Sequence, residues 1–429
     1  MLKNNSFAKP LSLLVSTKIK LLGSLALLLA MQASLAADVG REQQLVSNFW
    51  NAGSESELRR SRDQLLGAVP DVETLYNLFK AGAVYSDEVD QGQQESVRIA
   101  EDGTRFPYVF LIPENYDSAR SYPVEFMLHG GVSRPEWEPG GGWWRRGYDS
   151  LMDDDKITVV PAAWNDQFWW QQGQAESIAD ILRTLKQTYN IDDNRVTLSG
   201  VSDGGTGAYF FAFKQPTDWA AFLPYIGHPA VLRNPQSGGG YRLFFETLMN
   251  KPMYIVNGEK DPLYPVSAVS PFIDILADVG VDHIFRPIKD GGHNTRWLPD
   301  ETPMIEQFKL DNPRDPFPEN INWVTDRTDR YNRNHWIQID ERMEVGRTAI
   351  LEVGRQGNIF DVTADGVAQF TLLLNPEEVN FDQDIIVNVN GEKKFEQQVD
   401  QQAEVLLDWV QKTMDRSMLF SAELQLNLR

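Results

Sequence analysis

The strongest chemical signal in the chain is a serine between closely spaced glycines. The segment reads Gly200-Val201-Ser202-Asp203-Gly204, with Gly205 directly after it. A strand pattern precedes it and a helical run, Gly207 to Lys214, follows, so the serine falls on a sharp strand-to-helix turn. Such a turn strains the serine backbone, and flanking glycines remove side chains that would clash there. This context predicts Ser202 as a nucleophile; the alternative is an ordinary glycine-rich turn.

A serine hydroxyl needs a general base to act as a nucleophile, and the chain has only five histidines. His293 lies in a glycine-rich loop after a predicted strand around Ile284, which suits the presentation of an imidazole. His283 falls within a strand pattern, and His228 comes too early in the chain for the Ser, Asp, His order. His293 is therefore the predicted base, whereas His228 is a candidate for lining the site.

The base in turn needs a carboxylate that orients the imidazole and stabilises its charged form. Asp261 follows directly after a predicted strand and lies between the serine and the histidine in the chain. Glu259 and Asp290 are rival carboxylates in the neighbouring sequence. A turn-forming aspartate before Pro262 is the structural alternative. Asp261 is the predicted acid of the triad.

A developing oxyanion requires two backbone N–H donors. One donor is predicted to be the amide of Asp203, the residue after the nucleophile. The other is predicted to be the amide of Gly131, in the His129-Gly130-Gly131 loop after an early strand. His129 would brace this loop rather than transfer protons. By itself the His-Gly-Gly sequence could be a plain turn. The predicted chemistry passes through an acyl-enzyme and needs no metal or cofactor.

Tryptophans gather between the early strands, at positions Trp137, Trp143, Trp144, Trp164, Trp169 and Trp170. Their rings would suit the wall of a pocket for an aromatic, acyl or sugar-bearing substrate. The candidate substrate-binding residues are therefore Trp164, Trp169 and Trp170, together with the two histidines His129 and His228. The alternative is that these rings only pack the loops over the core.

The segment that carries these residues, 84–312, alternates short apolar runs with helical patterns. The runs are Val109–Ile112, Val124–Leu128, Ile157–Val160, Arg195–Ser199, Met253–Val256 and His283–Phe285, and helical stripes cover Ser177–Tyr189 and Ile273–Val279. Buried strands separated by helices predict an α/β fold with a mainly parallel sheet covered on both faces. Functional groups in such sheets gather at the carboxyl ends of the strands.

Two further regions flank this domain. Residues 37–83 have helical spacing, and residues 313–429 have the period-two pattern of a β-rich domain. Asn312 to Pro316 resembles a linker. One hairpin is predicted over Ile359–Leu374, around Gly366, and another at Asn390-Gly391, a strong turn signal.

The first 36 residues have the features of a secretory signal. They carry four lysines and no acid, then the apolar run Leu21–Met31, and end in Ser34-Leu35-Ala36. We expect cleavage after Ala36 and a periplasmic or secreted product without stable membrane insertion. An uncleaved anchor is the alternative, although the run is short for a bilayer span.

Composition excludes several classes of function. There is no cysteine, so disulfides, thiolate metal sites and a cysteine nucleophile are excluded. The formal net charge is −21, and removal of the four leader lysines would make it −25. Nucleic acid is therefore not an expected partner, because phosphate backbones would repel such a chain. The expected partner is a small or oligomeric ester substrate, and the oligomeric state is not indicated.

Four segments together resemble a known group: Leu128 to Gly131, Asn194 to Gly205, the Asp261 loop and Gly292-His293. They are similar to secreted esterases and prolyl-oligopeptidase-related α/β-hydrolases, including feruloyl and acetyl esterases and polyhydroxybutyrate-depolymerase-like proteins. The resemblance covers residues 105–310 and implies an α/β-hydrolase fold and a Ser-His-Asp mechanism. The segment Asn322 to Ile337 resembles a C-terminal region of some bacterial members. The absence of cysteine departs from depolymerases that carry a disulfide.

Three functions follow from these features. The first is an exported serine hydrolase that cleaves carboxylic esters. The second is a serine peptidase of the prolyl-oligopeptidase type, which the resemblance associates with an N-terminal β-propeller; the helical pattern seen here instead favours an esterase. The third is a non-catalytic binding protein in which the C-terminal β-rich domain is the working part.

Overall fold

The computed structural model describes residues 40–135, 144 and 151–429, which fall into two compact units, Met1–Val84 and Tyr85–Arg429. In the first unit, residues 40–50, α2 (Glu55–Ala68) and α3 (Val72–Ala81) are helical. Phe49 packs edge-on against Phe79, with 5.6 Å between ring centroids. The predicted signal lies outside the described residues. No helix in the described ranges is long and apolar enough to cross a membrane.

The second unit contains a sheet whose strands occur in the order β1-β2-β4-β3-β5-β6-β7-β8. The strands are β1 (Gly92–Ile99), β2 (Arg105–Ile112), β3 (Tyr122–Leu128), β4 (Ile157–Pro161), β5 (Ile191–Val201), β6 (Ala221–Tyr225), β7 (Met253–Gly258) and β8 (His283–Ile288). Strand β2 runs antiparallel to its neighbours β1 and β4, whereas all later pairs are parallel. The mainly parallel α/β-hydrolase sheet predicted from the sequence is confirmed.

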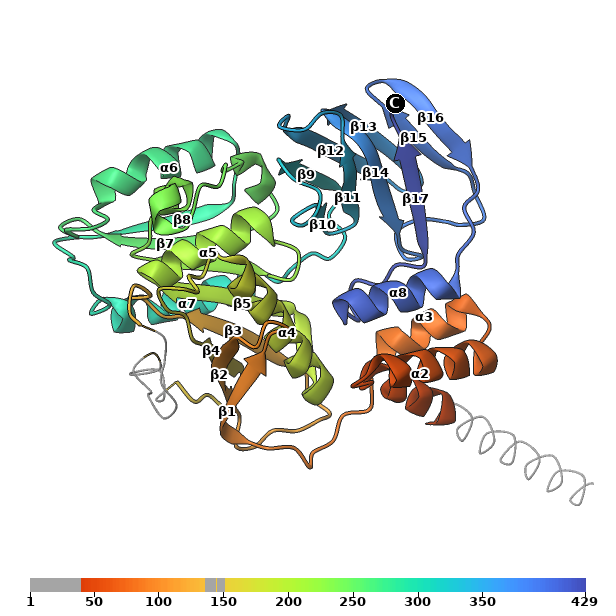
Figure 1. The fold of residues 1–429 in the computed structure, drawn as a ribbon, viewed down its shortest axis with the longest axis horizontal. Helices are drawn as coiled ribbons and strands as arrows, with labels where there is room; N and C mark the ends of the chain where they lie inside the picture. The colour runs from red at the N-terminus through yellow and green to blue at the C-terminus, as the bar shows by residue number, and fades with distance from the viewer. Residues whose placement is uncertain (1–39, 136–143, 145–150) are drawn as a thin grey trace, which may run out of the picture. The chain divides into compact units, whose positions relative to one another are not determined.

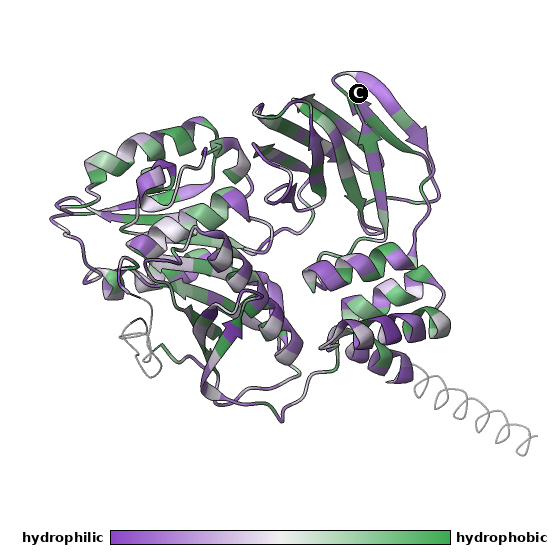
Figure 2. Cartoon of the chain, viewed as in Figure 1, coloured by the Kyte–Doolittle hydropathy of each residue, from purple (hydrophilic) through white to green (hydrophobic). Residues whose placement is uncertain are grey.

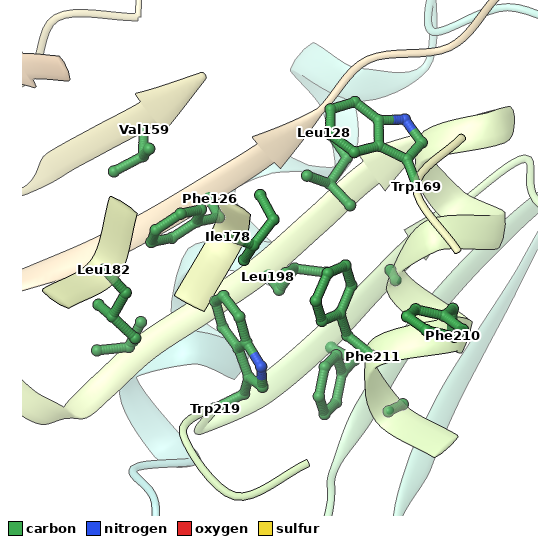
Figure 3. Close-up of a cluster of buried hydrophobic side chains, with 14 of the residues drawn as sticks. Phe126, Leu128, Val159, Trp169, Ile178, Leu182, Leu198, Phe210, Phe211 and Trp219 are labelled. Carbon is green, nitrogen blue, oxygen red and sulfur yellow. The ribbon is translucent and has the colours of Figure 1, made fainter. Parts of the chain in front are cut away.

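Helices cover both faces of this sheet, because its central strands carry apolar side chains on both sides. The helices α4 (Gln172–Thr188), α5 (Asp203–Lys214) and α6 (Val266–Asp278) contribute to one apolar core, and α7 (Leu298–Asp311) contributes to another. Neighbouring residues of one strand enter different cores: Phe222 faces the first and Leu223 the second. Figure 1 shows α4 and α5 lying across the sheet. Figure 3 shows Phe210 and Phe211 of α5 among the side chains of the first core.

Two further sheets follow α7. One has the order β10-β11-β14-β17 and the other β16-β15-β13-β12-β9. Their bounds are β9 (Asn320–Thr325), β10 (Arg333–Asn334), β11 (Ile337–Arg342), β12 (Ala349–Gln356), β13 (Ile359–Asp365), β14 (Val367–Leu374), β15 (Ile385–Val389), β16 (Glu392–Gln397) and β17 (Ala422–Asn427), with α8 (Ala403–Thr413) before the last strand. Side chains of both sheets form one apolar core. The edge strand β16 is hydrophilic (Figure 2), as expected of an edge exposed to water. The predicted β-rich region is confirmed.

One of the two predicted hairpins is wrong. Strand β13 pairs with β12 and β15, whereas β14 pairs with β11 and β17, so the two strands belong to different sheets. Gly366, at φ +67°, turns the chain from one sheet into the other. The second hairpin is confirmed: β15 and β16 pair antiparallel around Asn390 and Gly391, both with positive φ.

Residues 312–316, which resemble a linker in the sequence, connect α7 to β9 and also carry a buried side chain. Arg314 is buried, and its guanidinium lies 2.7 Å from Oδ2 of Asp415. It also donates to the carbonyl oxygen of Thr217 and to Oδ1 of Asn194. The segment therefore carries a buried cation that joins the hydrolase sheet to the C-terminal sheets, a role that its proline-rich composition concealed.

Candidate active site

Ser202 occupies the turn between β5 and α5 in a strained conformation, with φ 59° and ψ −114°. The two neighbouring glycines leave no room for a side chain. A Cβ atom on Gly200 would lie 2.1 Å from the carbonyl oxygen of Gly204, and one on Gly204 would lie 2.0 Å from that of Leu128. Only glycine fits these approaches, so the G-x-S-x-G spacing is a packing requirement of the turn.

The structure brings the three predicted triad residues together. Nε2 of His293 lies 2.8 Å from Oγ of Ser202, and its Nδ1 lies 2.8 Å from Oδ2 of Asp261. The carboxylate side chain is fully buried, whereas the imidazole is 21% exposed. A hydroxyl, an imidazole and a buried carboxylate in one hydrogen-bonded line can carry out nucleophilic catalysis with proton transfer through the imidazole.

The other oxygen of the carboxylate is held by its own loop. Oδ1 of Asp261 accepts hydrogen bonds from the backbone N–H groups of Leu263 at 2.8 Å and Tyr264 at 2.9 Å. The phenol ring of Tyr264 packs edge-on against His293, with 5.8 Å between centroids. The Asp261 carboxylate is therefore held by backbone donors. The His293 imidazole is held by this carboxylate and by the ring of Tyr264.

The rival carboxylates make different contacts. The side chain of Glu259 accepts a hydrogen bond from the N–H of Asp290, and the carboxylate of Asp290 pairs with Lys260 at 2.5 Å. The N–H of Lys260 also donates to the carbonyl oxygen of Gly291 at 2.8 Å. These contacts join the loop that carries Asp261 to the loop that carries His293. Of the three carboxylates, Asp261 is the one that contacts the imidazole.

The two predicted oxyanion donors flank the nucleophile. Among the described residues, neither the N–H of Gly131 nor that of Asp203 has a hydrogen-bond acceptor. Gly131 has φ +71°, and a Cβ atom on Gly130 would lie 3.6 Å from Oγ of Ser202. The Asp203 amide also begins helix α5, whose N-terminus favours negative charge. The arrangement suits a tetrahedral oxyanion.

His129 is buried behind this loop rather than exposed to a ligand. Its Nε2 accepts a hydrogen bond from the N–H of Ala163 at 3.0 Å, and its Nδ1 donates to the carbonyl oxygen of Gly130 at 2.9 Å. Burial lowers the pKa of His129 to about 4, so the ring is neutral near pH 7. Its carbonyl oxygen accepts from Nε1 of Trp169. These contacts fit the bracing role.

The remaining substrate-binding candidates are mostly buried. Trp164, Trp169 and Trp170 are at most 2% exposed, which fits the packing alternative. Trp137 and Trp143 lie outside the described residues, and Trp144 is buried. The ring nitrogens of the last candidate, the half-buried His228, contact the N–H of Ala230 and the carbonyl oxygen of Ala268.

Three polar groups near the site were missed from the sequence. The carboxylate of Asp203 accepts a hydrogen bond from the N–H of Val132 at 3.0 Å. The buried amide of Asn257 donates to the carbonyl oxygens of Gly227 and Tyr264, which holds the acid loop. The contacts from Val132 to Asp203 and from Asn257 to Gly227 join residues that are distant in the chain, so the sequence carries no local signal for them.

The third missed group is an ion cluster beneath the nucleophile strand. Lys156 and Lys309 both contact the Glu125 carboxylate, at 3.0 and 2.7 Å, and both also pair with Glu306. Burial raises the pKa of Glu125, but the two ammonium groups outweigh burial and lower it to about 2. Glu125 also accepts a hydrogen bond from Oγ of Ser199 on β5.

In the described ranges, no group of three His, Cys, Asp or Glu side chains forms a metal site.

Comparison with known proteins gives partial matches. No protein-family model matches the chain. A bifunctional acetylxylan esterase/xylanase from Neocallimastix patriciarum is 31% identical over 113 residues, which is 25% of this chain and 16% of that relative.

Two solved structures match about half of the chain. A thermostable esterase has 20% identity and a TM-score of 0.42, over 52% of this chain and 63% of that one. An acylaminoacyl peptidase has 15% identity and a TM-score of 0.42, over 52% and 42%. The chain is therefore similar, over part of its length, to an acetylxylan esterase/xylanase, to an esterase structure and to an acylaminoacyl peptidase structure.

Proposed function

We propose that this chain is a serine hydrolase that cleaves carboxylic esters, with Ser202 as nucleophile, His293 as general base and Asp261 as the orienting acid. One observation carries the proposal: Oγ of Ser202 and Oδ2 of Asp261 each lie 2.8 Å from opposite nitrogens of one imidazole. The strained backbone of the serine and the burial of the acid support it, because both hold reactive groups in fixed positions.

In the acylation step, Oγ of Ser202 attacks the carbonyl carbon of the ester while its proton passes to Nε2 of His293. The negative charge moves to the carbonyl oxygen, which accepts hydrogen bonds from the amides of Gly131 and Asp203. The Asp261 carboxylate stabilises the imidazolium without taking its proton. The imidazolium then protonates the departing alkoxide, and an acyl-serine and an alcohol result.

The deacylation step uses the same groups in reverse. His293 takes a proton from water, and the hydroxide formed attacks the acyl carbon. A second oxyanion forms on the same two amides and collapses, with release of the carboxylic acid. His293 returns its proton to Oγ of Ser202, so the enzyme is restored without any other reactant.

An ester rather than a peptide amide is the proposed substrate class. The relative from Neocallimastix patriciarum is named as an acetylxylan esterase, and its identity over the matched residues supports a small acyl ester. An ester is also intrinsically easier to cleave than an amide, because its carbonyl is less stabilised by resonance and an alkoxide leaves more easily than an amide anion. The comparison structures include a peptidase, so a peptide substrate is the alternative to be tested.

The test compares ester and amide hydrolysis by the purified protein. We expect p-nitrophenyl acetate to be hydrolysed at least tenfold faster, by kcat/KM, than a peptide p-nitroanilide. A panel of acetyl, longer acyl and feruloyl esters then orders acyl preference. Ser202→Ala is the control and should lose both activities. Preference for the peptide anilide would favour a peptidase, and no turnover of either substrate would favour a binding protein.

Export is a separate part of the proposal. The lysine-rich start, the apolar run and the small residues before Ala36 support a cleaved leader, and the mature chain would begin at Ala37. Expression of the full chain in a bacterial host, followed by fractionation and N-terminal sequencing, tests this. A product that keeps Met1, or that stays in the membrane fraction, would contradict it.

A further inference from the structure

The side chain of Asp203 bridges the two halves of the proposed oxyanion site. Its backbone amide, at the start of α5, is one proposed donor, and its Oδ2 accepts a hydrogen bond from the N–H of Val132 at 3.0 Å. Val132 directly follows Gly131, whose amide is the other proposed donor. One residue after the nucleophile therefore supplies a donor and also holds the loop that supplies the second donor.

The loop needs this anchor because its central residue is conformationally free. Gly131 has φ +71°, a conformation that glycine enters and leaves at low cost. On the N-terminal side of that residue, Gly130 is confined: a Cβ atom there would lie 2.9 Å from both Cβ of Ser202 and the carbonyl oxygen of Val201. On the C-terminal side, the side chain of Val132 is buried in the apolar core, and its N–H is held by the hydrogen bond to Asp203. The Gly131 amide is thus held between two constrained residues, Gly130 and Val132.

We propose that the Asp203 carboxylate is a positioning residue, which aims the Gly131 amide at the oxyanion by holding the Val132 N–H. This inference rests on the proposed esterase function and assigns a side chain to it. The proposed role requires that the side chain of residue 203 place an acceptor oxygen at the Val132 N–H. Negative charge is not required, and it would oppose the oxyanion that forms nearby.

Because an acceptor oxygen is required, asparagine and alanine at position 203 should have different effects on activity. The amide oxygen of asparagine can accept the same hydrogen bond without the charge, whereas alanine offers no acceptor. We expect Asp203→Asn to keep kcat within about threefold of wild type or to raise it. We expect Asp203→Ala to lower kcat by roughly 10²-fold with KM changed less than about threefold, because a misplaced donor weakens only the transition state.

The experiment measures kcat and KM for p-nitrophenyl acetate in wild type, Asp203→Asn, Asp203→Ala and Ser202→Ala. For the proteins that keep Ser202, each rate is divided by the fraction of active sites titrated with a fluorophosphonate. The melting temperature is recorded for every variant. Asp274→Ala is the matched control, because Asp274 is exposed on α6 and makes no hydrogen bond or ion pair with other described residues. It should behave as wild type.

The possible results separate the two proposals. A loss of kcat in Asp203→Ala that Asp203→Asn rescues, at full active-site occupancy, supports the positioning role. Equal losses in both variants, or wild-type kcat in Asp203→Ala, would overturn it while an active wild type and an inactive Ser202→Ala leave the esterase function intact. An inactive wild-type protein would instead overturn the esterase function itself.

Discussion

Gly130 packs directly against the nucleophile: a Cβ atom at this position would lie 2.9 Å from Cβ of Ser202. It would lie equally close to the carbonyl oxygen of Val201. Neither neighbour is the end of a flexible side chain, so the backbone of one loop or the other would have to shift. The glycine therefore sets the distance between the oxyanion loop and the serine.

Gly130→Ala should reduce kcat for p-nitrophenyl acetate by roughly 10²-fold, because a displacement of the donor loop or the serine by a fraction of an ångström spoils the reacting geometry. The fold should survive, since the loop is open to solvent on one side. Activity assays and melting curves check both statements. Gly67→Ala in α2 is the control: no atom lies within 4 Å of the new Cβ, so activity should not change. Wild-type kcat in Gly130→Ala would contradict this account of the loop.

Asp261→Asn should lower kcat by roughly 10⁴-fold while the protein stays folded, because an amide cannot stabilise the imidazolium and favours the wrong tautomer. Glu259→Gln should stay within about threefold of wild type, because a glutamine oxygen can still accept the hydrogen bond from Asp290. Steady-state kinetics of both variants provide the check. A larger loss in Glu259→Gln than in Asp261→Asn would show that the acid was assigned to the wrong carboxylate.

The sequence alone predicted the sheet, its helices and the three residues that meet at its edge. The structure confirms the sheet and its helices and brings the three residues together, because their signals are local: a serine between glycines after a strand, and a histidine in a glycine loop. The catalytic roles of the three residues stay a prediction. Predictions failed where the outcome depends on distant partners. Strands β13 and β14 have the pattern of a hairpin, but each pairs with strands from elsewhere. The buried contact of Arg314 with Asp415 likewise had no signal in the sequence, because the two residues lie far apart in the chain.

The same reason explains the missed contacts at the site. The residue type of Asp203 says nothing about Val132, because 71 residues separate the two in the chain. The clustering of tryptophans in the sequence is compatible with a pocket wall or with packing over the core, and the full burial of Trp169 favours packing. Periodicity predicts which face of an element is apolar, whereas it does not predict which loops meet.

His129 should make folding stability depend on pH. Burial lowers its pKa to about 4 from an ordinary value of 6.5, so the unfolded chain takes up its proton at a higher pH than the folded chain. Between pH 6.5 and 4 the unfolded state binds more protons, and stability falls as the pH falls, by on the order of 3 kcal/mol in total. Urea unfolding at several pH values, in wild type and in His129→Gln, measures this contribution as the difference between the two slopes.

The comparison of wild type with His129→Gln contains its own control. All other titrating residues are common to wild type and His129→Gln, so their effects cancel in the comparison. Wild type should lose more stability than the variant between pH 6.5 and 4. If the free energy of unfolding of the two proteins changed equally with pH, His129 would have the same pKa in the folded and unfolded chains. The proposal that burial keeps this ring neutral would then be wrong.

Asp415 should contribute strongly to stability. Its side chain is fully buried, lies 2.7 Å from the Arg314 guanidinium and accepts hydrogen bonds from the N–H groups of Ser417 and Met418. Asp415→Ala leaves a buried, unpaired guanidinium, and we expect a loss of about 3–5 kcal/mol in the free energy of unfolding. Urea denaturation is the measurement. Asp415→Asn retains an acceptor oxygen and should lose less; an equal loss in both variants would mean that charge alone matters.

The most direct test of the central claim is the rate of covalent labelling by a fluorophosphonate, followed by intact mass and peptide mapping. In wild type we predict one adduct per chain, on Ser202. In His293→Gln, with the fold unchanged, labelling should be at least about 10³-fold slower, because the serine then lacks its base. An adduct on another residue, or equal labelling rates in the two proteins, would contradict the account.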